Sequence, residues 1–85
     1  MEEKEIGQIT HYFAHVDVGV IKISGGELKI GDKIAIRGHT TNIEEVVESM
    51  QIEHENVETA KKGDSVGIKV KERVRTGDKV YLITE

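Results

Sequence analysis

The sequence predicts an all-β domain, a small closed barrel built from short strands. The 85 residues include eleven Ile and ten Val but only two Leu, and β-branched side chains suit a pleated sheet better than a helix. The dipeptide Gly-Asp occurs three times, each time directly before an apolar stretch. The expected strands, about six in number, are short and evenly spaced, which favours closure because a closed sheet leaves no edge exposed.

Each Gly-Asp pair is expected to turn the chain and to start a strand. The pairs lie at 31–32, 63–64 and 77–78. Glycine supplies the backbone angles of a tight turn, and the aspartate side chain can accept backbone N–H groups just beyond it. We therefore expect strands to begin directly after these three turns.

The first part of the chain predicts a hairpin followed by a plugged corner. We expect strands at 6–13 and 18–23, paired with each other, and a disordered tail at 1–5. Phe13 is expected to pack in the core, because small barrels need large residues at their ends. Leu28 and Ile30 are expected to plug the space between two glycine turns.

Residues 41–58 carry two conflicting patterns. Apolar residues at helical spacing follow a Thr-x-x-Glu sequence that resembles a capping box, and this alone indicates an amphipathic helix. The segment is nevertheless rich in β-branched residues and short. We therefore predict strand for 43–52.

The last third of the chain shows the cleanest alternation. Val66, Ile68 and Val70 are expected to face inward, as are Ile34 and Ile36 earlier in the chain. A final strand is expected over 80–83. The sequence contains no proline and no linker-like run, so residues 1–85 are predicted to form a single domain.

Composition excludes several classes of protein. Without cysteine there is no disulfide framework, thiolate metal site or thiol nucleophile. Apolar runs are too short for a membrane span and the acidic start is unlike a signal peptide, so we expect a cytoplasmic protein with no membrane contact. The 33% of charged residues, with few Asn and Gln, favours a thermophilic source.

Charge is unevenly placed along the chain. The net charge is −4, but residues 1–60 carry −7 and residues 61–85 carry +3. Two interpretations of the basic C-terminal part remain open: a local contact with phosphate, or a solvated strand face.

A series of short motifs resembles a known domain. They are Gly-x-Leu-Lys-x-Gly-Asp at 26–32, Val47-Glu48, AKKGDSVG at 60–67 and VRTGDKV at 74–80. In order and spacing they resemble the β-barrel second domain of translational GTPases, of the elongation factor Tu and initiation factor two type. The resemblance covers residues 6–83 and is closest to small stand-alone translation elongation factor-like proteins.

The resemblance implies a closed barrel of six to seven antiparallel strands that contacts transfer or ribosomal RNA, with a long bulged strand over 43–52. In elongation factor Tu a Val-Glu-x-x-Arg run helps to hold the aminoacyl nucleotide; here Val47-Glu48 match and Gln51 replaces the arginine, which removes the guanidinium fork. The candidate RNA-binding residues are Glu48, Gln51, Lys69, Lys71, Arg73, Arg75 and Tyr12. An ordinary solvated strand surface is the alternative for these residues.

No catalytic constellation stands out in the sequence. There is no phosphate-binding loop, so we expect neither GTP binding nor GTP hydrolysis. His11 and His15, four apart on a strand, would lie about 13 Å from each other, too far to share a metal ion. The acidic residues are interpreted as a solvated face. We therefore expect no enzyme activity, no metal and no cofactor.

The sequence thus predicts a non-enzymatic, translation-factor-like β-barrel module that contacts transfer RNA, ribosomal RNA or an RNA–protein complex. The alternative is a protein partner. The chain would then be a protein–protein interaction domain, with residues 44–58 docking on a basic protein, or an accessory domain that works with an RNA-modifying or peptidase U32-type enzyme.

Overall fold

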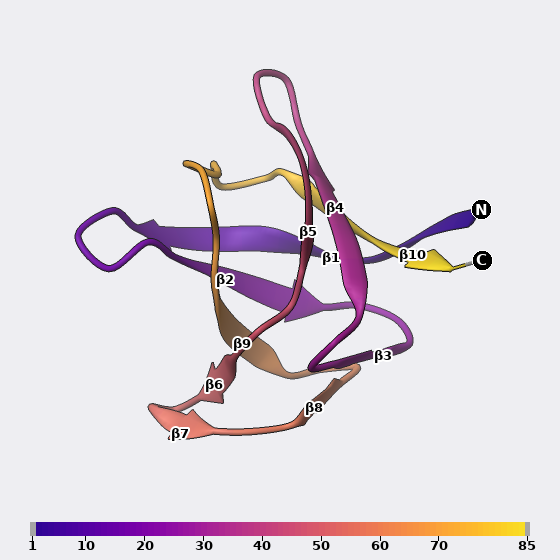
Figure 1. Cartoon of the computed structure of the whole chain (residues 1–85), viewed down its shortest axis with the longest axis vertical. Coiled ribbons are helices and arrows are strands. Elements are labelled where there is room, and N and C mark those ends of the chain that lie inside the picture. The colour runs from indigo at the N-terminus through magenta and orange to yellow at the C-terminus, as the bar shows by residue number, and fades with distance from the viewer. Residues whose placement is uncertain (1, 85) are drawn as a thin grey trace.

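A computed structural model describes residues 2–84 and shows an all-β fold, without a helix in that range. Ten strands follow one another along the chain (Figure 1). Their bounds are β1 Glu2–Phe13, β2 Val18–Ile23, β3 Glu27–Lys29, β4 Lys33–Arg37, β5 Asn42–Val46, β6 Met50–Ile52, β7 Glu55–Asn56, β8 Thr59–Lys61, β9 Ser65–Lys69 and β10 Lys79–Thr84. Since the described chain contains no helix, it has none long and apolar enough to cross a membrane.

Eight strands form one antiparallel sheet in the order β5-β4-β10-β1-β2-β9-β6-β7, and β3 pairs with β8 in a separate ribbon. Among the described residues the end strands β5 and β7 do not pair with each other, so the prediction of a closed barrel of six to seven strands is not supported. The reason lies at residues 47–49, where the chain leaves the sheet. There Val47 exchanges backbone hydrogen bonds with Gly31 and Asp32 instead of extending β5.

The core lies on the concave side of this curled sheet. The inward prediction is confirmed for five alternating residues and for Leu28, all of which are buried: Ile34, Ile36, Val66, Ile68 and Val70. Ile30 is 45% exposed, so its predicted role as a plug is wrong. Ile30 lies at the outer corner of the turn that ends at Asp32. Its backbone makes the contact there, because its N–H donates to the carbonyl of Glu58.

Residues 43–52 form strands, as predicted, and not a helix. They divide into β5 and β6 around the break at 47–49, so the long bulged strand that the resemblance implied is absent from this part of the structure. Alternation along β5 places Ile43 and Glu45 inside and Glu44 and Val46 outside. The apolar residues here fall at helical spacing only by coincidence, since they belong to two separate strands and to the break between them.

The three Gly-Asp turns share one geometry and do start strands. Their glycines all have φ of 96°, and β4, β9 and β10 each begin directly after the aspartate. Each aspartate carboxylate accepts the backbone N–H of the residue three positions earlier at 2.9 Å: Lys29, Lys61 and Arg75. Each carboxylate therefore binds an N–H group that precedes it in the chain, whereas we expected from the sequence that it would bind one that follows.

Strand β1 crosses the whole molecule and contains two irregularities. Residues 2–5 belong to the strand and not to the expected tail, because they pair with Tyr81–Thr84 of β10; Met1 lies outside the described residues. A bulge between Ile9 and His11 then reverses the faces of the strand. Phe13 therefore points outward and is 44% exposed, so the prediction of a core Phe13 is wrong.

Candidate functional site

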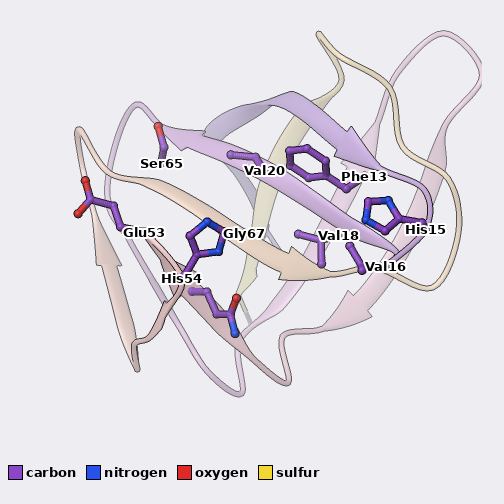
Figure 2. A pocket seen from close by; sticks show the side chains of 10 residues that line it. Phe13, His15, Val16, Val18, Val20, Glu53, His54, Ser65 and Gly67 are labelled. Carbon is purple, nitrogen blue, oxygen red and sulfur yellow. The ribbon is translucent and has the colours of Figure 1, made fainter.

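A groove lies on the outer face of the sheet, across the ends of β1, β2, β9 and β6 (Figure 2). It measures about 640 Å³. Ten residues from these strands and two turns line it: Phe13, His15, Val16, Val18, Val20, Gln51, Glu53, His54, Ser65 and Gly67. Apolar side chains gathered on a solvent-facing surface mark an interaction site more often than scattered ones do.

The strand register explains why this surface is apolar and hollow. Val20 of β2 pairs with His11 on one side and with Gly67 on the other, and Gly67 in turn pairs with Gln51. Gly67 has no side chain, so the centre of this outward-facing row is empty. The bulge in β1 places Phe13 beside Val18, where it forms one wall.

The aromatic wall is ordered. The rings of His11 and Phe13 are stacked, with centroids 6.2 Å apart and planes within 9° of each other. They lie two residues apart on the face that the bulge turns outward. A flat ring surface of this kind can stack against another flat or apolar group.

Two turns that flank the groove carry non-glycine residues at positive φ. Asp17 has φ of 55° in the β1–β2 turn, and Glu53 and His54 have φ of 51° and 66° in the two-residue turn between β6 and β7. Positive φ at both turn positions is the type I′ geometry, which strongly prefers Asn-Gly. These are the only non-glycine residues with positive φ in the described chain, and strain of this kind concentrates at functional sites.

Most polar groups at the rim can both donate and accept hydrogen bonds. His15, His54, Gln51 and Ser65 can each donate, and Glu53 is the only Asp, Glu, Lys or Arg among the lining residues that the structure describes. The Gln51 side-chain amide also donates to Asn56 Oδ1 at 3.1 Å, which fixes its orientation. The floor therefore carries no formal charge, and the rim offers donors together with acceptors.

Of the predicted RNA-binding residues, Gln51 alone lines the groove. Tyr12 lies on the opposite face of β1, half-buried against the core, with its hydroxyl donating to Asp17 Oδ1 at 3.4 Å. Glu48 is exposed in the break between β5 and β6 and lines a separate small hollow with Ile30. The structure thus separates the two residues that the Val-Glu-x-x-Gln motif joined.

The predicted basic residues also fail to gather in the groove. Lys69 ends β9 next to Val18, while Lys71, Arg73 and Arg75 lie in the connection between β9 and β10. The Lys71 backbone N–H donates to the buried carboxylate of Glu45, and the Arg75 side chain donates to Thr40 Oγ1 at 2.9 Å. Arg75 therefore has a structural contact of its own.

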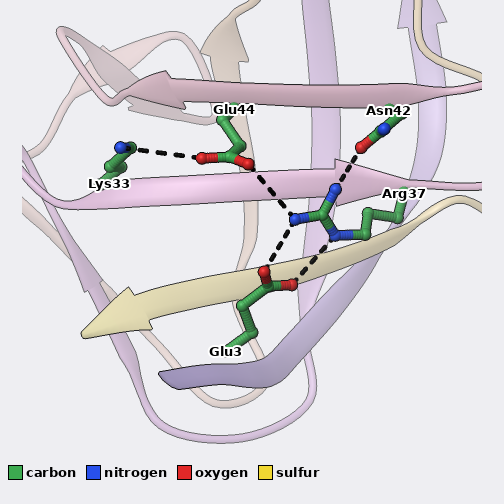
Figure 3. A network of polar contacts seen from close by, with 5 residues as sticks. All are labelled: Glu3, Lys33, Arg37, Asn42 and Glu44. Carbon is green, nitrogen blue, oxygen red and sulfur yellow. Dashed lines mark hydrogen bonds and ion pairs between the residues drawn. The ribbon is translucent and has the colours of Figure 1, made fainter. Parts of the chain in front are cut away.

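Charged residues elsewhere form a surface cluster (Figure 3). Arg37 of β4 donates to both carboxylate oxygens of Glu3, at 3.0 and 2.8 Å, and contacts Asn42 and Glu44. Lys33 lies 3.7 Å from Glu44. The hydrogen bonds from Arg37 lower the pKa of Glu3. This cluster ties the start of β1 to β4 across β10 and does not reach the groove.

Two carboxyl groups are buried among residues 2–84, those of Glu45 and Asp78, and Asp78 accepts the backbone N–H of Arg75 at 2.9 Å. Glu45 is 5% exposed, and this burial raises the pKa of its carboxyl, an effect opposed by the Lys71 N–H. The Lys71 N–H lies 3.4 Å from the carboxylate, and with the charge of Lys71 it opposes the effect of burial without reversing it.

The chain is similar in sequence to segments of proteins named for proteolysis. No family model matches it. It is 51% identical over 82 residues, 95% of its length, to uncharacterized protease MJ0090 of Methanocaldococcus jannaschii. It is 44% identical over 77 residues to a collagenase of Porphyromonas gingivalis. The chain spans about a fifth of the length of these relatives.

Its fold is that of a solved domain from a larger protein. The C-terminal domain of a protein of Geobacillus thermoleovorans named as a U32 peptidase superposes with a TM-score of 0.86, covering 96% of this chain and 93% of that one. A selenomethionine variant of the same domain gives 0.85. At 18% identity the similarity establishes the fold alone.

These findings correct two expectations. The resemblance to the second domain of translational GTPases is wrong, because the relatives are a protease and a collagenase and the matching solved domain comes from a U32 peptidase. The RNA-binding role that it implied is unsupported. The expectation of no enzyme activity is also contradicted, because the relatives are named as a protease and collagenases.

The sequence reasoning missed all groove residues except Gln51. One signal was present: the segment Val-Gly-Val-Ile-Lys-Ile at 18–23 has apolar residues on both faces of a strand. An apolar outer face indicates that something covers it. The bulge that turns Phe13 outward has no recognisable pattern in the amino-acid sequence.

Proposed function

We propose that this chain acts as the accessory domain of a U32-type peptidase and holds polypeptide for that enzyme in the groove. The single observation that carries the proposal is the match of 95% of the chain to a fifth of a protein named as a protease, at 51% identity. The matching domain of known structure, which occupies the C-terminal part of a U32 peptidase, supports the same assignment.

The position of the groove supports a substrate-holding role. Glu2 pairs with Thr84, so both ends of the described chain lie together, while the groove lies at the Phe13 end of β1 (Figure 1). Any polypeptide attached at either end would leave from the side opposite the groove. The groove is therefore turned away from the point of attachment and open to a second polypeptide.

A chimera tests this proposal. In protease MJ0090 of Methanocaldococcus jannaschii, the segment that matches this chain is replaced by residues 2–84, and cleavage of gelatin and of casein is compared with that of the intact enzyme and of a version lacking the segment. We expect the chimera to cleave at close to the intact rate and the shortened version to lose most activity. An inactive chimera, or full activity in the shortened version, would contradict the proposal.

A further inference from the structure

The groove lies on the face of the sheet and not at an edge, which limits what can bind there. Its floor strands β2 and β9 each pair with a neighbour on both sides, β9 with β6 at Gly67 and Ile68, so the backbone under the centre of the groove is already paired. A peptide in this groove cannot be held as an added strand. Its own backbone must do without partners from the floor.

An extended chain rich in proline meets that condition. A polyproline II segment makes no internal backbone hydrogen bonds, and proline has no N–H to satisfy. Its free carbonyls need donors, and the rim supplies them from His15, His54, Gln51 and Ser65. Its pyrrolidine rings need flat apolar surfaces, which Phe13 and the two valines of β2 provide.

The charge of the lining residues also favours an uncharged segment. The floor has no charged side chain, and the one carboxylate of the described lining residues, Glu53, lies at the rim. A strongly charged segment would lose its hydration over Val18, Val20 and Gly67 without gaining a counter-charge. An uncharged segment loses little there.

We infer that the groove binds an uncharged, proline-rich polypeptide segment in the extended polyproline II conformation. This inference rests on the proposed function, because it names the class of polypeptide that the accessory domain would hold for the peptidase. The bound segment crosses the outer face from the ring of Phe13 to the imidazole of His54, over the gap left by Gly67 (Figure 2).

The test is a titration of the isotope-labelled chain with decaproline, in which the chemical shifts of the backbone amides report binding. We expect shifts confined to residues 13–20, 51–54 and 65–67, and at least about tenfold weaker binding of a Gly-Ser peptide of equal length. Equal binding of both peptides, shifts elsewhere, or no shifts would overturn the inference.

Two matched variants locate the site. Val16 and Val46 are 44% and 48% exposed, one in the groove and one on the outer face of β5. Because both are exposed, neither Val16→Glu nor Val46→Glu removes a core contact. Val16→Glu should weaken decaproline binding about tenfold and Val46→Glu should leave it unchanged. Equal effects of the two would overturn the site.

The decaproline titration and the chimera assay test different claims, so one can fail while the other succeeds. An active chimera with no decaproline binding would leave the accessory role intact and refute the ligand class. Decaproline binding with an inactive chimera would refute the role in the peptidase. Loss of a self-associated form of the chain on Val16→Glu, seen by sedimentation, would show that a second copy occupies the groove and would overturn the inference.

Discussion

Single residues on the inner and outer faces of this sheet depart from the usual pattern in opposite ways. Glu45 is a buried carboxyl in a mainly aliphatic core, and Phe13 is the one aromatic ring among the large apolar residues exposed on the described surface. Burial of the Glu45 carboxyl disfavours its charged form, and Phe13 forms one wall of the groove. Glu45 faces inward by the alternation of β5, whereas Phe13 faces outward because the bulge between Ile9 and His11 interrupts the alternation of β1.

Glu45 should make stability depend on pH. In the unfolded chain its carboxyl ionises around its ordinary pKa of 4.5, whereas burial raises the pKa in the folded state. The folded state is therefore penalised as pH rises from the ordinary value through the raised one, and the penalty persists above it. Below both values the carboxyl is neutral in both states and the penalty disappears.

We expect Glu45→Gln to raise the melting temperature at pH 7 and to change it much less at pH 4. The glutamine oxygen can still accept the Lys71 N–H, so the hydrogen bond is preserved. Thermal unfolding followed by circular dichroism at the two pH values checks this, with Glu58→Gln on the exposed surface as control. A larger gain at pH 4 than at pH 7 would contradict the account.

At the level of elements, turns determine where the strands start and how the groove is shaped. The Gly-Asp turns repeat one design three times, with glycine at φ of 96° and the aspartate closing back on the chain. The β6–β7 turn does the opposite and places Glu53 and His54 where glycine would be favoured.

Removing one turn aspartate should cost a modest, defined amount. Asp64→Ala leaves the Lys61 N–H without its carboxylate acceptor and should lower the free energy of unfolding by about 1 kcal/mol. Asp64→Asn keeps an oxygen acceptor in place and should cost less. Urea unfolding measures both, and an equal loss in the two variants would show that the hydrogen bond is not the stabilising contact.

Relieving strain in the β6–β7 turn should stabilise the fold and impair binding. The double variant Glu53→Asn, His54→Gly supplies the favoured type I′ sequence and should add about 1 kcal/mol per position. It also removes the His54 imidazole from the groove, so decaproline binding should weaken. Urea unfolding and the shift titration report the two effects, and unchanged stability would refute the strain argument.

Much of the element pattern could be predicted from the sequence, and the site could not. Alternation in Val66–Val70 and the Gly-Asp turns located strands correctly because both signals are local. The missing closure depends on the bend at 47–49, and the exposure of Phe13 depends on a one-residue bulge that forms only when β1 pairs with β2. Both are consequences of pairing between distant segments.

At the scale of the whole molecule, the paired ends of the described chain and the groove lie on opposite sides. Strand β1 runs the length of a domain with extents of 32 × 27 × 20 Å, with the paired ends of the described chain at one end and the groove at the other. The charged cluster around Arg37 fastens the first of these ends. This arrangement suits a domain that is anchored to an enzyme and reaches outward for polypeptide.

The most direct test is the rate of gelatin cleavage by the chimeric protease carrying either Val16→Glu or Val46→Glu in the grafted chain. If the groove holds the polypeptide for cleavage, Val16→Glu should slow cleavage of gelatin about tenfold, added decaproline should inhibit the chimera, and Val46→Glu should cleave at the unmodified rate. Equal rates for the two variants, with no inhibition by decaproline, would contradict the account.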